Sequence, residues 1–241
     1  MTRDEYVNDF RKTYSIVSKL AEKNGCMVLR MRHKTLQKDI VLHSLPQAMP
    51  IYRELMSICH ENLPLVYDCV DLVDGQIVLE EFIDGQTVAQ VLETGKYKKS
   101  GARTVILSLC NALGVLHDKG FVHRDIKPEN IMIRDNGTVV LLDFNASRKI
   151  TKDSPEKNDC NAKDTVIMGT VGYASPEQLG ITQTDERADI YATGILLNVM
   201  LTGKHPSEML ARGKAGKIVK KCTAINPDDR YQSAQKLAEA L

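Results

Sequence analysis

The feature that most constrains the fold is a change in hydrophobic pattern near residues 84 and 85. Before that point the apolar residues form short runs bounded by turn signals, over 14–20, 27–31, 39–45, 65–73 and 77–82. Asp74-Gly75 between the last two runs is a strong β-hairpin signal. One short helix, with Pro50 in its first turn and Glu54 inside, interrupts these strands. The front of the chain is therefore predicted to be an antiparallel sheet.

After residue 85 the pattern becomes helical. Apolar residues recur at helical spacing from Val105 to Leu116, and further helices are predicted over 187–202 and 233–241. We therefore expect an α+β chain of two lobes. Residues 1–83 form a small antiparallel sheet lobe with one short helix, and residues 84–241 form a mainly helical lobe.

Composition excludes several classes of protein. The formal net charge is +1, so no overall field favours nucleic acid or a membrane as partner. The first residues are polar and charged, with no apolar signal core behind them. Six scattered cysteines without a Cys-x-x-Cys pair disfavour a zinc site or a disulfide framework. We expect a cytoplasmic protein with reduced thiols.

Two short motifs carry the chemistry. Asp125 and Asn130 lie five residues apart just after a predicted helix, and Asp143 follows the apolar strand over 139–142. A hairpin through Asn136-Gly137 would return Asp143 to the side of Asn130. Phosphoryl transfer requires such oxygen donors to hold a metal ion against phosphates, and one carboxylate to orient the attacking hydroxyl.

The sequence HRDIKPEN followed by DFN resembles the protein kinase superfamily, most closely the bacterial relatives of eukaryotic serine/threonine kinases. The resemblance covers nearly the whole chain. It extends to GTVGYASPE, which ends at Glu177, to ADIYATG with Asp189, and to NPDDR with Arg230. The resemblance implies a buried ion pair between Arg230 and Glu177.

The resemblance also implies the catalytic roles. Asp125 would accept or orient the proton of the substrate hydroxyl, and Lys127 would neutralise the transferred phosphate and mark serine/threonine specificity. Asn130 and Asp143 would be ligands of Mg²⁺. Thr170 would bridge Asp125 and Lys127 and form the floor of the acceptor site.

Substrates implied in this way are serine and threonine hydroxyls of proteins, including the chain's own activation segment. Thr165 is the best-placed acceptor there, and Arg124 is suited to binding the resulting phosphate. ATP is the implied phosphoryl donor. Leu79 would be the gatekeeper, with Glu80 to Phe82 as the hinge that faces adenine. The apolar residues implied to enclose the adenine are Val28, Val41 and Met132.

One departure from the family concerns the nucleotide phosphates. His43 in IVLH stands where the family has the lysine that contacts them. An imidazole titrates near neutrality, so its charge is present only at lower pH. Lys23, Arg30 or Arg32 could supply the missing charge, or each could be an ordinary surface residue.

Two further departures lie nearby. Of the family's glycine-rich loop only Gly25 remains, and it is out of register. Glu54 is the best match to the family's helix glutamate. With no lysine to pair, Glu54 could be solvated or bound to Arg30 or Arg32.

Three functions therefore compete. The main hypothesis is an active, ATP- and Mg²⁺-dependent protein serine/threonine kinase, because Asp125, Lys127, Asn130, Asp143 and Thr170 are all present. The alternative from another class is a pseudokinase that acts as a nucleotide-binding or protein-interaction scaffold, suggested by His43 and the glycine-poor loop. A small-molecule phosphotransferase is disfavoured by the GTVGYASPE segment.

Overall fold

The computed structural model describes residues 1–150, 172–179 and 184–241. Thr165 and Thr170, expected to serve as phosphate acceptor and as floor of the acceptor site, lie outside these ranges. The chain divides into two compact units, Met1–Asp84 and Gly85–Leu241. The sequence analysis placed this boundary one residue earlier.

The first unit is built on a five-stranded antiparallel sheet with strand order β1-β2-β3-β5-β4. Asn24 and Gly25, both with positive φ (51° and 76°), form the two-residue turn between β1 and β2. A positive φ at both positions is typical of tight hairpin turns, in which Asn-Gly is strongly preferred. All five predicted strands are present. They are β1 (Tyr14–Lys23), β2 (Cys26–His33), β3 (Asp39–Leu45), β4 (Val66–Leu72) and β5 (Gly75–Glu81).

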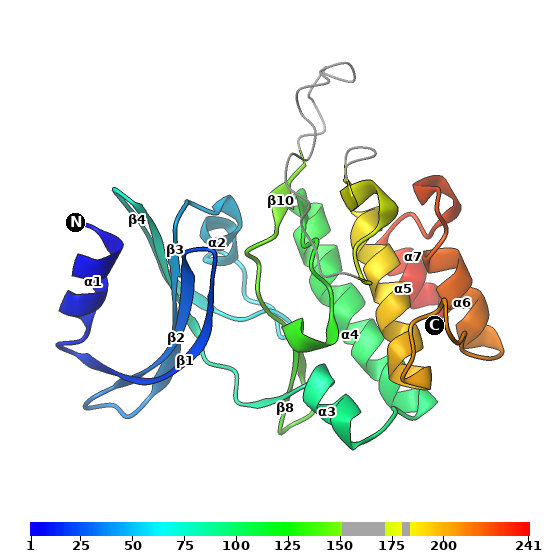
Figure 1. Cartoon of the computed structure of the whole chain (residues 1–241), viewed down its shortest axis with the longest axis horizontal. Coiled ribbons are helices and arrows are strands. Elements are labelled where there is room, and N and C mark those ends of the chain that lie inside the picture. The colour runs from blue at the N-terminus through cyan, green and yellow to red at the C-terminus, as the bar shows by residue number, and fades with distance from the viewer. Residues whose placement is uncertain (151–171, 180–183) are drawn as a thin grey trace, which may run out of the picture. The chain divides into compact units, whose positions relative to one another are not determined.

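A helix that the sequence analysis did not predict, α1 (Arg3–Phe10), covers one face of this sheet (Figure 1). Thr2 and Glu5 form a capping box at its N-terminus. Val7 packs in a buried cluster with residues of β2, β3 and β5, and Phe10 packs against its edge. The hydrophobic pattern does not reveal this helix, because most of its residues are polar and only a narrow stripe is apolar.

The predicted short helix is α2 (Pro50–Leu55), which begins at Pro50 after the extended residue Met49. Its buried residues are Ile51, Tyr52 and Leu55. It lies on the side of the sheet opposite α1 (Figure 1). Both faces of the central strand β3 are therefore covered, whereas most of β1 is exposed.

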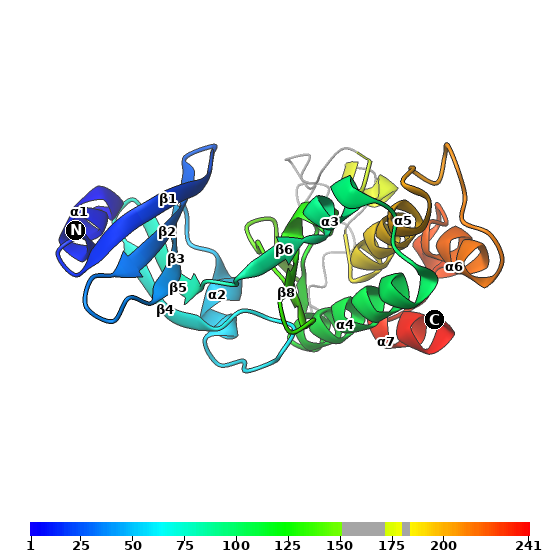
Figure 2. The same ribbon diagram turned by 90° about the horizontal axis from the view of Figure 1, so that it is seen from below.

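The second unit is mainly helical, and it carries a three-stranded sheet in the order β6-β8-β9 and a two-stranded pair of β7 and β10. Figure 2 shows β6 and β8 side by side. Its strands are β6 (Gly85–Thr87), β7 (Phe121–Val122), β8 (Ile131–Arg134), β9 (Val139–Leu141) and β10 (Arg148–Lys149). Its helices are α3 (Val88–Thr94), α4 (Lys99–Asp118), α5 (Arg187–Thr202), α6 (Lys214–Cys222) and α7 (Ala234–Ala240), with short 3₁₀ turns at η1 (Pro128–Asn130), η2 (Pro176–Leu179) and η3 (Pro227–Asp229).

The core of the second unit forms around α4 and α5. The apolar residues that predicted α4, from Val105 to Leu116, are buried. Gly194 on α5 allows α6 to approach closely, since a Cβ at this position would lie 2.3 Å from the Cβ of Cys222. No helix among the described residues combines the length and the apolar content that crossing a bilayer requires.

Candidate active site

The loop that follows β7 is held by a buried aspartate of α5. Asp189 accepts backbone hydrogen bonds from His123 (2.9 Å) and Arg124 (2.8 Å), and its Oδ2 lies 2.9 Å from Nε2 of His117. Burial alone would raise the pKa of Asp189, but the hydrogen bond from His117 and the other donors lower it below its usual value. A buried carboxylate thus connects the loop to α5, a helix most of whose residues are buried.

His123 holds the next part of the loop through both ring nitrogens. Burial lowers the pKa of this histidine, so the ring is neutral. Its Nε2 lies 3.1 Å from the carbonyl oxygen of Leu142, and its Nδ1 lies 3.3 Å from the backbone N–H of Asp125. This arrangement fits one tautomer, in which Nε2 donates to Leu142 and Nδ1 accepts from Asp125.

Three of the predicted catalytic side chains meet on this loop. Oδ2 of Asp125 accepts hydrogen bonds from Nζ of Lys127 (2.6 Å) and from Nδ2 of Asn130 (3.0 Å). Nδ2 of Asn130 also donates to the backbone carbonyl of Asp125 (2.8 Å). The carboxylate is therefore held in one orientation beside a cation, as a group that positions a hydroxyl needs to be.

The predicted hairpin joins β8 and β9 and returns the chain to this loop. Ile131 pairs with Leu141, and the backbone N–H of Leu142 donates to the carbonyl of Asn130 (2.8 Å). Asp143 directly follows Leu142 and is thereby brought near Asn130. The buried Phe144 then packs edge-on against His123, with ring centroids 5.3 Å apart.

Asp143 has a left-handed backbone, with φ of +63°. Residues other than glycine rarely adopt this conformation, although Asp and Asn tolerate it better than most. Such strain tends to be retained where a side chain must be aimed at a functional site. Its Oδ1 accepts a hydrogen bond from the backbone N–H of Asn145 (3.3 Å).

The oxygen atoms of Asn130 and Asp143 suit a magnesium ion. The amide nitrogen of Asn130 is turned toward Asp125, so its carbonyl oxygen points the other way. No group of three His, Cys, Asp or Glu side chains that could bind a metal exists among the described residues. Mg²⁺ does not require one, because it keeps several waters and combines one or two protein oxygens with phosphate oxygens.

On the first unit, strand register decides which residues share a face with His43. His43 pairs with Val28 of β2 and Val78 of β5, and Val41 pairs with Glu80. Because alternate residues of a strand face the same side, Val28, Val41, His43 and Glu80 all lie on one face. This places four of the predicted nucleotide residues together.

His43 and Glu80 form a buried pair on that face. Their side chains are 6% and 4% exposed, and Nε2 of His43 lies 3.5 Å from Oε1 of Glu80. The sequence analysis considered these two residues separately. His43, at the position of the family's lysine, therefore contacts Glu80, the first residue of the predicted hinge.

The helix α2 presents Tyr52 to this pair. The rings of His43 and Tyr52 are 5.6 Å apart. Glu54 lies two residues further along α2, about 200° around the helix axis from Tyr52. The helix glutamate predicted for the nucleotide site therefore faces away from the side on which α2 contacts His43.

The prediction that Leu79 is a gatekeeper beside these residues is wrong. Leu79 is paired with Leu42 and packs against the cluster that contains Val7 of α1. It therefore lies on the opposite face from His43. Glu80, the next residue of β5, lies on the same face as His43. Neighbouring residues of a strand face opposite sides of the sheet, so Leu79 and Glu80 cannot both lie on the face of His43.

Two of the three cations that could replace the lysine have a partner on the sheet. Asp39 accepts hydrogen bonds from Nε of Arg30 and from Nε of Arg32, each 2.6 Å long. The hydrogen bonds from Arg32 and Arg30 lower the pKa of Asp39 to about 2. Arg30 also stacks 4.1 Å above the ring of Phe82, one of the predicted hinge residues. Lys23 is exposed at the end of β1.

The last predicted residues belong to the second unit. Met132 is half-buried on β8, paired with Thr87 on one side and Val140 on the other. The predicted ion pair between Arg230 and Glu177 is confirmed. Two guanidinium nitrogens of Arg230 donate to the two oxygens of Glu177, over 2.6 and 2.8 Å.

This loop, its hairpin and the buried ion pair are the parts of a kinase catalytic core, and residues 13–240 match the family described as protein kinase domain. The chain belongs to the protein kinase family.

Among characterised proteins it is similar to bacterial serine/threonine kinases. It is 31% identical over 236 residues to the probable serine/threonine-protein kinase SCO3848 of Streptomyces coelicolor, a match that covers 85% of this chain and 34% of that protein. It is 34% identical over 154 residues to the probable serine/threonine-protein kinase PknB of Corynebacterium glutamicum, covering 62% and 23% of the two chains. It is 26% identical over 245 residues to the serine/threonine-protein kinase PknA of a Nostoc species, covering 93% and 43%. The chain thus spans less than half the length of these relatives.

Proposed function

We propose that this chain is a protein serine/threonine kinase domain that transfers the γ-phosphoryl group of ATP with the help of Mg²⁺. The observation that supports the proposal most is the geometry around Asp125. The side-chain nitrogens of Lys127 and Asn130 both lie within 3.0 Å of one carboxylate oxygen of Asp125. The hairpin bond between Leu142 and Asn130 adds Asp143 to the same group.

Each residue has a distinct role in this proposal. Asp125 accepts a hydrogen bond from the attacking hydroxyl and orients its oxygen toward the γ-phosphorus atom. It takes the proton as the new oxygen–phosphorus bond forms and the bond from the γ-phosphorus to ADP breaks, so that ADP leaves. Lys127 neutralises negative charge on the transferred group. Asn130 and Asp143 hold Mg²⁺, which when bound supplies charge neutralisation at the phosphates.

The first unit would supply contacts to the nucleotide. Val28 and Val41 offer the apolar surface that an adenine ring needs, and His43 lies on the same face. Protein substrates follow from the family and from the names of its relatives, and Lys127 supports serine or threonine as the acceptor. These roles are assigned to individual residues on the basis of the family resemblance and the geometry.

A specific observation favours a second candidate, a pseudokinase scaffold. Nε2 of His43 lies 3.5 Å from Oε1 of Glu80, so an imidazolium at this position would be at least partly neutralised within the sheet. A nucleotide would then bind more weakly than with a lysine. We favour the active enzyme, because the relatives are named kinases and the group around Asp125 is intact.

Phosphate incorporation distinguishes the two candidates. Purified protein incubated with Mg-ATP and a serine- and threonine-containing protein substrate should transfer phosphate, and Asp125→Asn should lower the rate by at least about 100-fold. The substitution keeps the shape of the side chain and removes its charge. Asp118→Asn removes an exposed carboxylate at the end of α4. It serves as control and should leave the rate unaltered. Equal rates in the parent and Asp125→Asn would contradict the kinase proposal.

The role of His43 predicts a dependence on pH. An imidazole opposes the nucleotide's charge only when it is protonated, whereas an ammonium stays charged throughout the neutral pH range. His43→Lys should therefore raise turnover about tenfold or more at pH 8 and less at pH 6. The measurement is the initial rate at saturating and limiting ATP at both values.

Two further variants complete this comparison. Glu80→Gln removes the carboxylate that faces His43 and should reduce any gain in ATP affinity at low pH, because a buried imidazolium would lose the anion that stabilises it. Arg32→Ala tests the alternative source of charge. A loss with Arg32→Ala, together with no gain from His43→Lys at either pH, would show that β2 supplies the phosphate contact.

A further inference from the structure

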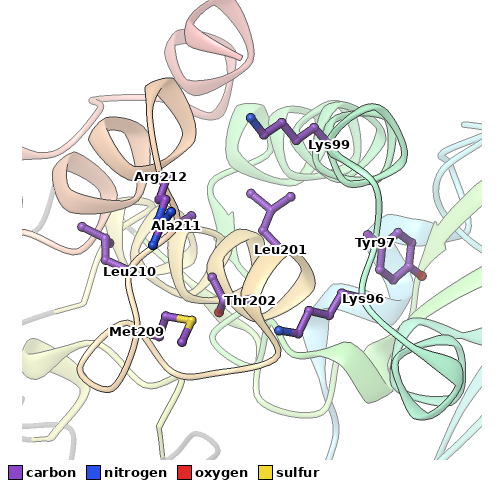
Figure 3. A pocket seen from close by; sticks show the side chains of 9 residues that line it. All are labelled: Lys96, Tyr97, Lys99, Leu201, Thr202, Met209, Leu210, Ala211 and Arg212. Carbon is purple, nitrogen blue, oxygen red and sulfur yellow. The ribbon is translucent and has the colours of Figure 1, made fainter.

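A hollow of about 480 Å³ lies on the second unit between two connecting segments, one joining α3 to α4 and the other joining α5 to α6 (Figure 3). Its apolar surface comes from Leu201, Met209 and Leu210. Met209 is 50% exposed. The residues proposed for phosphoryl transfer do not line this hollow.

Three cations surround the apolar surface. Lys96, Lys99 and Arg212 line the hollow, and all three are exposed. In Figure 3 the side chains of Lys96 and Lys99 extend toward the segment that carries Arg212. None of the three forms an ion pair with an acidic residue in the described part of the chain. Glu208, the acidic residue of the α5–α6 segment, is paired with Lys204 (3.1 Å).

The walls of the hollow are fixed by buried hydrogen bonds. Asn198 on α5 donates to the carbonyls of Lys204 (2.8 Å) and Met209 (2.7 Å) and accepts from the N–H of Ala211 (2.8 Å). On the other side, the N–H of Tyr97 donates to the carbonyl of Met200 (2.9 Å). A surface ordered before binding loses little conformational entropy when it binds a ligand.

We propose that this hollow is a docking site for a short acidic segment of the protein substrates, with carboxylates against Lys96, Lys99 and Arg212 and an apolar side chain on Leu201 and Met209. Charge complementarity favours this occupant, because the lining contains three cations and no carboxylate. An exposed charge pair contributes little alone, so a segment that presents several carboxylates beside an apolar residue fits better than a single small anion. The inference deepens the proposed kinase function, on which its substrate role depends.

The helix α5 connects the proposed docking site to the catalytic loop, and its length gives the distance between them. Asp189 near its start binds the catalytic loop, and Leu201 in the hollow lies twelve residues further along the same helix. At 1.5 Å per residue the separation along the helix is about 18 Å. An extended peptide covers that distance in about five or six residues. The docking segment should therefore lie at least about five residues from the phosphorylated serine or threonine.

Binding is tested without ATP by fluorescence polarisation of labelled peptides that lack serine and threonine. The probe Asp-Glu-Leu-Asp-Leu-Glu should bind at least about tenfold more tightly than Asp-Glu-Asn-Asp-Asn-Glu or Lys-Lys-Leu-Lys-Leu-Lys. The double variant Lys99→Glu with Arg212→Glu should weaken binding of the first peptide about tenfold or more. Met209→Ser should weaken it about threefold. Lys220→Glu, an exposed cation of α6 outside the lining, is the matched control and should have no effect.

Three outcomes would overturn the docking site. One is equal affinity for the three peptides, or unchanged affinity in the double variant. Another is complete displacement by inorganic phosphate together with no effect of Met209→Ser, which would identify a site for small anions. A third is self-association in sedimentation experiments that the double variant abolishes, which would identify a second copy of the chain as occupant.

A kinetic experiment separates this inference from the proposed function. The first peptide is joined to a serine acceptor by a linker of about eight glycine and asparagine residues, long enough to span the helix. The parent should show a KM at least about tenfold lower for this substrate than for the acceptor alone, with kcat unchanged, and the double variant should lose the difference. If no phosphate is transferred at all but the peptide binds selectively, the kinase proposal fails and the docking site stands.

Discussion

Asp143→Asn is expected to lower phosphate transfer by about 1000-fold or more, while nucleotide affinity falls much less. Asp143 is the anionic member of the proposed pair of Mg²⁺ ligands, so its loss removes the charge that holds the metal against the phosphates. Asparagine is the better substitution here, because at φ +63° alanine would also strain the backbone. The rate of phosphate transfer and the affinity for ATP are measured on the same preparation.

Asp135→Asn is the matched control, since Asp135 is an exposed aspartate in the turn of the same hairpin. It should leave both the rate and the affinity unchanged. Full activity of Asp143→Asn would refute the assignment of this residue as a metal ligand. Equal losses of rate in the two variants would point to a defect of the hairpin instead of the metal site.

Arg230→Met is expected to destabilise the second unit by about 3–5 kcal/mol. The side chain of Arg230 is 0% exposed and binds Glu177 through two hydrogen bonds. It also donates to the backbone carbonyls of Ala224 (2.8 Å) and Ile225 (3.1 Å). Methionine fills similar space but leaves the carboxylate of Glu177 buried without its cation. The measurement is the urea midpoint and slope of unfolding.

Two variants test whether the loss of stability comes from the carboxylate of Glu177, buried without its cation. Adding Glu177→Leu to Arg230→Met should recover part of the lost stability, because the buried carboxylate is then gone. Asp228→Ala breaks an exposed pair with Arg187 (2.5 Å) and should cost no more than about 1 kcal/mol. A cost for Arg230→Met as small as that for Asp228→Ala would show that the buried pair contributes little.

The catalytic group was largely predictable because its members are close in the sequence. Asp125, Lys127 and Asn130 lie on one loop, and the hairpin signal Asn136-Gly137 foretold the return of Asp143. The sequence analysis identified Asp189 by its motif only. Its bonds to His123 and Arg124 join residues more than sixty positions apart, and no local pattern encodes such contacts.

The nucleotide face was predicted less well, and β5 shows why. Its run Ile77-Val78-Leu79 is apolar throughout, because α1 covers one face of the sheet and α2 the other. A strand buried on both faces lacks the alternation that would reveal its register. The pattern therefore did not show that Leu79 lies on the face opposite His43, and it did not reveal the contact of His43 with Glu80.

The sequence by itself determined the five strands of the first unit, the family, and the catalytic loop, since all of these depend on local spacing and turn chemistry. Tertiary structure alone decided which face each residue of β5 occupies, that α1 packs on the sheet, and that three cations meet at an apolar hollow beside Leu201. These features arise where distant segments pack together. The free energy that selects them comes from burial and charge pairing across the fold, which no short stretch of sequence contains.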